Sequence, residues 1–223
     1  MRALVVYESL WGNTETVART TAARLAAGAE VDVLDSDAAP SSAEGYDLLV
    51  VGGPTHAFSM TRPATRADAV KSHSAPREPV RGIREWLSQL ERSGAGIPAA
   101  AFDTRVDKPR MPGSAAKAAK HELRSLGFET SIRQQTFRVH GYEGPLLDGE
   151  TNGLQLGLTL FSNTRGPAGE AAIRSPAGDT GCCSRRQVAP GMDVAVRLSR
   201  PARLRRQFAE PLPAGRGLRA GNG

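Results

Sequence analysis

The sequence predicts an α/β protein with a doubly wound parallel sheet and helices on both of its faces. Two features of residues 1–141 support this prediction: short apolar runs alternate with amphipathic segments, and polar loops follow three of the apolar runs. In chain order the expected elements are β-α-β-β-α-β-α-β. Parallel strands need long crossover connections, which helices usually supply, so this alternation favours a parallel sheet.

Five apolar runs are expected to form the strands. The run RALVVY at 2–7 is rich in β-branched residues and has few polar breaks, which is typical of a strand buried on both faces. The later strands are expected at 30–35, at 46–53, at 97–103 and, as one broken strand, at 128–132 and 136–141.

Three segments have the apolar periodicity of helices. The first is 13–28, where Gly28 is a natural end, and the others are 79–92 and 113–127. Residues 54–78 are rich in Pro, Ser, Thr, Arg and His, and we expect a long surface loop there. Loops of that length inside a compact domain are usually functional or disordered.

The regular pattern stops at about residue 150. Residues 1–150 are therefore expected to form the domain, and residues 151–223, which are rich in Arg, Gly and Pro, are expected to form an irregular, disordered tail. A single-base frameshift near codon 151 is one hypothesis for its origin. One added G can turn codons for TNGLQLG into codons for TERAAAW, a sequence that favours a helix.

The basic charge of the chain belongs to this tail. Residues 154–223 hold 11 Arg and four acidic residues, whereas residues 1–153 hold 18 Lys and Arg against 19 Asp and Glu. The net charge of +6 therefore does not indicate nucleic-acid binding by the domain. Cys182 and Cys183 are adjacent, so they suit neither a disulfide framework nor a metal motif. No apolar run is long enough to span a membrane, and a cytoplasmic location is expected.

The stretch ESLWGNTETVA at 8–18 joins the first strand to the first helix. Backbone N–H groups at a helix start lack partners within the helix and favour anions, and Gly12 permits a tight turn. The same Ser, Asn and Thr residues are also common helix caps, so a phosphate cradle and an ordinary capped turn both remain open. The stretch lacks the Lys of a Walker A loop and the spaced glycines of a dinucleotide fold, which disfavours ATP and NAD.

Two more polar loops, at 53–62 and 103–110, are expected to leave the same edge of the sheet as 8–14. In open parallel sheets, ligands bind at the carboxyl ends of the strands. This convergence is the main functional indication in the sequence. His56 could stack on a planar ligand or be a solvated loop residue, and Arg105 could equally be a solvated charge.

The stretch SLWGNTE at 9–15 resembles the phosphate loop of the flavodoxin family, which has the form Ser/Thr-x-Ser/Thr-Gly-x-Thr. It departs from the family at Trp11, where a hydroxyl is usual. The stretch PTH at 54–56 is similar to the first ring-flanking loop, with Ala57 where many flavodoxins have Gly. The stretch FDTRVDKP that begins at Phe102 is similar to the second.

The resemblance covers about residues 1–150 and implies a flavodoxin-like three-layer sandwich, with a five-stranded parallel sheet in the order 2-1-3-4-5. It implies FMN as the cofactor and assigns no catalytic or metal-binding residue. Two family features are missing, namely an acidic docking face and a final helix after residue 150. The cofactor contacts that the resemblance implies are Ser9, Leu10, Trp11, Gly12, Asn13, Thr14, Pro54, Thr55, His56, Ala57, Phe58, Asp103, Thr104 and Arg105.

The function expected from this resemblance is non-covalent FMN binding and electron transfer between redox proteins. One alternative is an FMN-dependent reductase of a small substrate such as a quinone or a porphyrinogen. Another is a flavin-free or degraded binding module. No membrane or nucleic-acid partner is expected.

Overall fold

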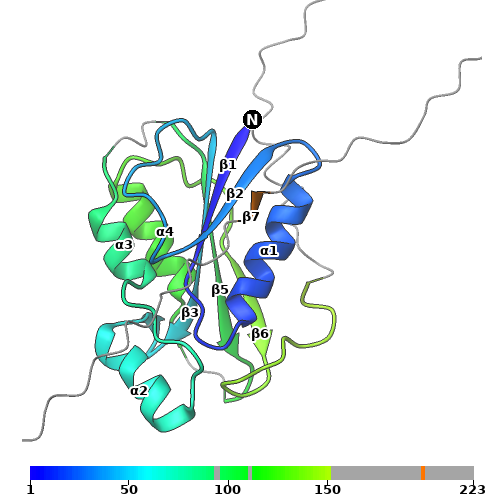
Figure 1. Cartoon of the computed structure of the whole chain (residues 1–223), viewed down its shortest axis with the longest axis vertical. Coiled ribbons are helices and arrows are strands. Elements are labelled where there is room, and N and C mark those ends of the chain that lie inside the picture. The colour runs from blue at the N-terminus through cyan, green and yellow to red at the C-terminus, as the bar shows by residue number, and fades with distance from the viewer. Residues whose placement is uncertain (93–95, 110–111, 152–196, 199–223) are drawn as a thin grey trace, which may run out of the picture.

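A largely parallel sheet forms the centre of the molecule (Figure 1). The computed structural model describes residues 1–92, 96–109, 112–151 and 197–198. Five main strands lie in the order β2-β1-β3-β5-β6, which is the predicted 2-1-3-4-5 arrangement. Their bounds are β1 (Arg2–Tyr7), β2 (Glu30–Asp35), β3 (Leu48–His56), β5 (Ala99–Val106) and β6 (Gln135–Val139).

The three central strands are apolar because both faces of the sheet are covered. In the parallel register, Val50 of β3 lies between Val5 of β1 and Ala100 of β5, and all three side chains are buried. Gly52 in β3 leaves room for the ring of Phe102, since a Cβ at Gly52 would lie only 2.0 Å from that ring. The near-continuous apolar runs of the sequence therefore reflect burial on both faces.

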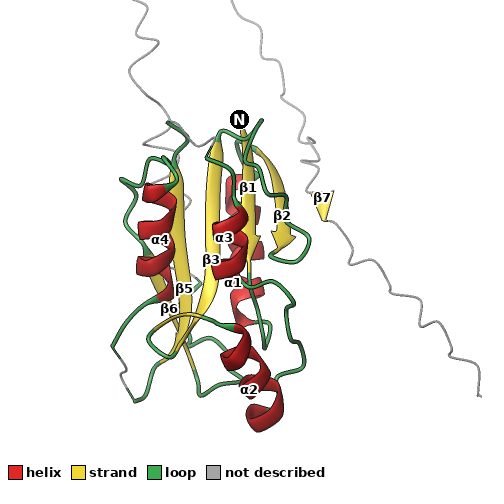
Figure 2. Cartoon of the chain, turned by 90° about the vertical axis from the view of Figure 1, so that its left-hand side faces the viewer, coloured by secondary structure: helices red, strands yellow, loops and turns green. Residues whose placement is uncertain are grey.

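The helices make the other two layers of the sandwich (Figure 2). Helix α1 (Asn13–Leu25) packs on one face, and it is the only helix on that face within the described part of the chain. Helices α3 (Ile83–Gln89) and α4 (Ala115–Ser125) pack on the other face. The predicted doubly wound fold is thus confirmed. None of the helices in the described residues is long and apolar enough to cross a membrane.

The segment 54–78 differs from the predicted surface loop. It contains the short strand β4 (Ser59–Met60), antiparallel to β3, and the helix α2 (Pro63–His73). Helix α2 was missed because only Arg66 and Ala69 of its residues are buried, so it has no apolar stripe. Periodicity detects helices through such a stripe.

The predicted elements that shorten most in the structure are the helix over 79–92 and the broken fifth strand. The helix expected over 79–92 begins at Ile83, and Val80 is exposed in the connection before it. Of the broken fifth strand, only Gln135–Val139 joins the sheet, whereas 128–132 contributes a single bridge from Glu129 to Pro98.

The predicted tail lies almost wholly outside the described residues. At its start, the backbone oxygen of Thr151 accepts a hydrogen bond of 2.9 Å from Arg24 Nη2. Farther along, β7 (Arg197–Leu198) pairs with β2 in parallel register and adds a strand at that edge of the sheet. The predictions of disorder and of a frameshift concern residues that the structure does not describe.

Candidate functional site

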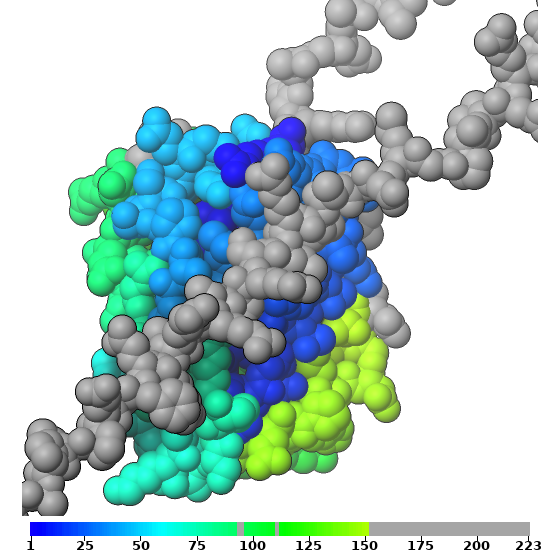
Figure 3. Space-filling model, viewed as in Figure 1, coloured from blue at the N-terminus to red at the C-terminus, as the bar shows by residue number. Residues whose placement is uncertain are grey.

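A cavity of about 490 Å³ opens at the edge of the sheet where the main strands have their carboxyl ends. In Figure 1 this is the lower end of the molecule, beside α2. In the space-filling view, α2 and the segment around β6 lie on either side of the blue N-terminal segment there (Figure 3). All of the residues predicted to contact a cofactor line this cavity except Gly12 and Asp103, so the three loops do converge: Ser9, Leu10, Trp11, Asn13, Thr14, Pro54, Thr55, His56, Ala57, Phe58, Thr104 and Arg105.

The first loop presents backbone donors at the start of α1. Gly12 has a φ of 89°, and its N–H donates to Ser9 Oγ over 3.0 Å, which closes the turn. In the described part of the chain, the N–H groups of Trp11, Asn13 and Thr14 have no acceptor. Unpaired N–H groups at a helix N-terminus carry partial positive charge and bind anions. This end of the cavity therefore suits an anionic group.

Two side chains of the first loop connect it to other segments. Thr14 Oγ1 lies 2.7 Å from Thr104 Oγ1, and both threonines are buried. Asn13 Nδ2 donates to the backbone oxygen of Glu143 over 2.9 Å, which joins the loop to the segment after β6. The shape of the cavity at this end thus depends on contacts between residues about 90 and 130 positions apart.

The second loop is a hairpin turn between β3 and β4. His56 pairs with Ser59, and the two residues between them have positive φ, 43° at Ala57 and 72° at Phe58. Such turns usually contain Gly or Asn, because a side chain is strained in this conformation. Phe58 is nevertheless 51% exposed at the cavity. The backbone of Phe58 packs against Gly113, where a Cβ would lie 1.9 Å from the Phe58 oxygen.

Asp103 is fully buried behind the third loop, outside the cavity. Its Oδ2 accepts hydrogen bonds from Thr55 Oγ1 (2.8 Å), Ser114 Oγ (2.6 Å) and the N–H of Ala116 (3.1 Å). It therefore joins β3 to the start of α4 and positions Thr55. Strand β5 continues to Val106, so the backbone of Asp103 lies between β3 and β6 instead of in a free loop.

Four rings form a continuous aromatic wall along the cavity. The ring of Trp11 lies 5.8 Å from that of His56 and 6.2 Å from that of Tyr142, and Tyr142 stacks on His73 at 4.3 Å. Burial lowers the pKa of His56, and the neighbouring His73 lowers it further, against the opposing effect of Asp68. His56 is therefore neutral near pH 7 and presents an uncharged ring to the cavity.

The sequence did not indicate several residues of this cavity. Helix α2 contributes Thr65, Asp68, Ala69 and His73, and the segment after β6 contributes Gly141 and Tyr142. Pro63 followed by Ala and Arg residues was the available signal for the helix, since Pro is common at the first helical position. Nothing local in the sequence places Tyr142 against Trp11. The remaining wall is formed by Val106, Lys108, Pro109 and Val139.

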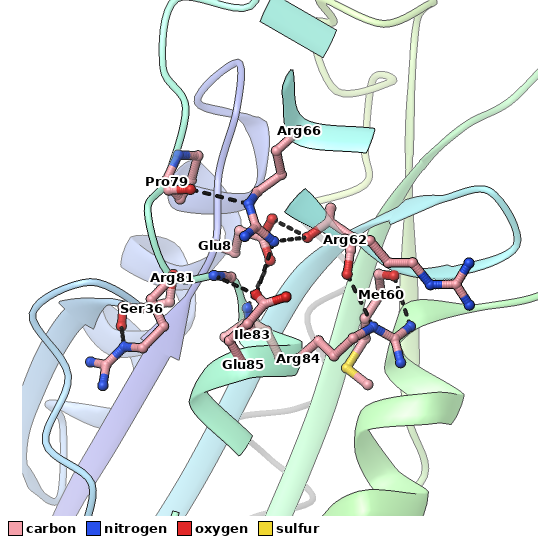
Figure 4. A network of polar contacts seen from close by, with 12 residues as sticks. Glu8, Ser36, Met60, Arg62, Arg66, Pro79, Arg81, Ile83, Arg84 and Glu85 are labelled. Atoms are coloured by element: carbon pink, nitrogen blue, oxygen red, sulfur yellow. Dashed lines mark hydrogen bonds and ion pairs between the residues drawn. The ribbon is translucent and has the colours of Figure 1, made fainter. Parts of the chain in front are cut away.

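A buried polar network holds α2 beside the sheet (Figure 4). Arg66 is 2% exposed, and its guanidinium donates to Glu85 Oε2 (2.9 Å), to Thr61 Oγ1 (3.1 Å) and to the backbone oxygen of Pro79 (3.1 Å). Thr61 in turn donates to Glu8, the residue that follows β1. Burial raises the pKa of Glu8, although its hydrogen bonds from Thr61 and from the backbone of Ile83 oppose that rise.

The similarity of this chain to known proteins lies in its fold. No protein-family model matches this sequence, and no curated protein matches it. Among solved structures, a flavodoxin from the domain Archaea has a TM-score of 0.52 at 16% identity and covers 74% of this chain and 100% of its own. The fold is flavodoxin-like. Flavodoxin 1 from Bacillus cereus gives a TM-score of 0.53 at 19% identity, covering 73% and 98% of the two chains, and flavodoxin 2 from the same organism gives 0.51 at 17%, covering 74% and 97%.

Proposed function

We propose that this protein is a flavodoxin-like carrier that binds FMN without a covalent bond and passes electrons between redox proteins. The observation that carries the proposal is the convergence of three polar loops, from the carboxyl ends of β1, β3 and β5, on a single cavity of about 490 Å³. Loops at this edge of an open parallel sheet are where such folds bind their ligands. The fold alone would not indicate a cofactor, because one fold supports many functions.

The residues at the α1 end of the cavity fit the phosphate of FMN. The unpaired N–H groups of Trp11, Asn13 and Thr14 point to an acceptor with several oxygen atoms. Ser9 Oγ already accepts from Gly12, so its own proton is available to a ligand. The two hydroxyls of the Thr14–Thr104 pair share one hydrogen bond, which leaves a second proton free.

The other end of the cavity fits a flat, mainly apolar ring system. His56 and Phe58 come from one side, and Arg105 and Val106 come from β5. Aromatic side chains and planar ligands attract one another through offset or tilted stacking. Bound FMN would supply the redox chemistry, and the chain would bind the phosphate, orient the ring and exclude water from one of its faces.

The direct test is to titrate the purified protein with FMN and follow visible absorbance and flavin fluorescence. We expect saturable binding with quenched fluorescence. A protein that is colourless when purified and does not change the spectrum of added FMN would exclude the carrier and favour a flavin-free binding module.

Removal of two hydroxyls tests the phosphate end. The double change Ser9→Ala, Thr14→Ala should weaken FMN binding by about tenfold or more, because hydrogen bonds to charged groups contribute about 1.5–3 kcal/mol each. Thr20→Ala is the matched control, since the Thr20 hydroxyl donates to Thr16 O within α1. Equal affinities of the double variant and the control would exclude the cradle.

A reductase of a small substrate is the second candidate, and helix α2 favours it. Thr65, Asp68 and His73 add polar groups to the cavity beyond those of the three loops. Such groups could orient a substrate such as a quinone beside the ring. Steady-state turnover of a quinone with a nicotinamide donor would favour the reductase. Electron transfer to a redox protein without such turnover would favour the carrier.

A further inference from the structure

The two tryptophans of this chain differ in whether the indole N–H has a hydrogen-bond acceptor. Trp86 lies in the core, and its indole N–H donates to the backbone oxygen of Pro40 over 2.8 Å. The Nε1 atom of Trp11 is also buried, but it has no hydrogen-bond partner among the described residues. Buried indole N–H groups usually have an acceptor, so the one on Trp11 needs an explanation.

The neighbours of Trp11 fix the position of its ring. The indole packs against an apolar cluster of Leu10, Ala69 and Ala75, in which each member is at most 5% exposed. His56 lies on one side of it and Tyr142 on another. Ala69 belongs to α2, the helix that the Arg66 network holds in place. The indole of Trp11 is therefore part of an ordered wall of the cavity.

The groups around Trp11 indicate what its partner would be. The adjacent cavity wall offers the N–H groups at the start of α1 and the hydroxyls of Ser9, Thr14 and Thr104. One carboxylate, that of Asp68, also lines the cavity, but it accepts a hydrogen bond from Ser72 Oγ. Donors thus outnumber acceptors at this end. An oxygen-rich anion is the ligand group that satisfies such a set.

We propose that the indole N–H of Trp11 donates to an oxygen of the ligand's phosphate and thereby makes the site select a phosphorylated flavin over riboflavin. This inference rests on the proposed function. It gives Trp11 the role of the hydroxyl that the flavodoxin-like loop lacks at this position. The ring would meanwhile shield the phosphate on the side of α2, which strengthens its hydrogen bonds with the loop.

The test compares the binding of FMN and of riboflavin to the wild type and to Trp11→Phe, a substitution that keeps an aromatic ring at this position. In Trp11→Phe the N–H is lost and an aromatic ring stays, and we expect FMN to bind about tenfold to a hundredfold more weakly. Riboflavin has no phosphate, so its affinity should change by less than about threefold. If both affinities fall by the same factor, or neither changes, the role in phosphate binding is overturned.

A second measurement uses the unchanged protein. With only two tryptophans in the chain, ¹⁵N NMR gives two indole signals, and Trp86 serves as an internal reference. FMN should slow exchange of the Trp11 indole proton with solvent, and riboflavin should not. Equal exchange rates with FMN and riboflavin would overturn the inference while leaving FMN binding intact. A wild-type protein that binds neither flavin would overturn the inference and the proposed function together.

Discussion

The turn between β3 and β4 contains two consecutive side-chain-bearing residues with positive φ, Ala57 and Phe58. A left-handed conformation costs such residues roughly 1–2 kcal/mol each. Strain of this kind persists where the surrounding structure holds it, and it is concentrated at functional sites. Here the turn lines the cavity and carries an exposed phenyl ring, so the two strained residues lie at the candidate site.

Replacing Ala57 with Gly should therefore stabilise the protein. Gly adopts a φ of 43° without steric strain, although it gains entropy in the unfolded chain, and the net increase expected in the free energy of unfolding is about 0.5–1 kcal/mol. Urea unfolding measures it. Ala23→Gly is the matched control, because Ala23 is exposed in α1 with helical φ and its replacement should cost about 0.5–1 kcal/mol. A loss in both variants would show that the turn is not strained.

At the scale of elements, α2 is held to the sheet more by polar contacts than by apolar ones. Its buried residues are Arg66 and Ala69, and the Arg66 guanidinium joins α2 to Thr61, to Glu85 and to the backbone of Pro79. A buried ion pair stabilises little relative to an apolar pair, but removal of one partner leaves an uncompensated charge. Arg66 is therefore the residue on which the position of this cavity wall depends.

Arg66→Met should lower the free energy of unfolding by about 3 kcal/mol, near the lower end of the range for broken buried pairs because Glu85 is partly exposed. Chemical unfolding at neutral pH measures the loss. Arg19→Met is the control. Arg19 pairs with Glu15 at the surface of α1, where one such ion pair contributes about 0.5 kcal/mol or less. Similar losses in both variants would contradict a structural role for the network.

The sequence was a good guide to strands and a poor one to α2. Strands β1, β3 and β5 are apolar because they are buried on both faces, and this burial produces continuous apolar runs in the sequence. The buried face of α2 consists of one arginine and one alanine, and an arginine is ordinarily a sign of exposure. Its burial depends on Thr61 and Glu85, which only the folded chain brings to it.

The candidate site, too, was predictable from the sequence only in part. Polar loops after apolar strands predicted where Ser9, His56 and Thr104 would meet, because the carboxyl ends of parallel strands share one edge. The burial of Asp103 and the contact between Trp11 and Tyr142 were not predictable, since they depend on the reach of side chains across segments far apart in the sequence. Whether these residues bind a cofactor stays a prediction.

At the scale of the whole molecule, the cavity exists only when distant parts of the chain are assembled. Its wall runs from Ser9 to Tyr142 and draws on the loop after β1, on α1, α2, β3, β5 and β6, and on the segment after β6. An unfolded chain has no such site. By mass action, a ligand that binds only the folded state must then stabilise all of the elements that form its site.

We therefore expect FMN to raise the free energy of unfolding by about 2.7 kcal/mol when its free concentration is 100 times Kd, with about 1.4 kcal/mol more for each further tenfold. Urea unfolding at a series of FMN concentrations measures this increment. Riboflavin at the same multiple of its own Kd should give the same increment, because the linkage depends on saturation and not on the contacts made. The Arg19→Met variant should respond as the wild type does, since Arg19 pairs with Glu15 and is absent from the cavity wall. An unfolding midpoint that stays constant across saturating FMN would mean that the flavin binds the unfolded chain as well, and the assembled cavity would then not be its site.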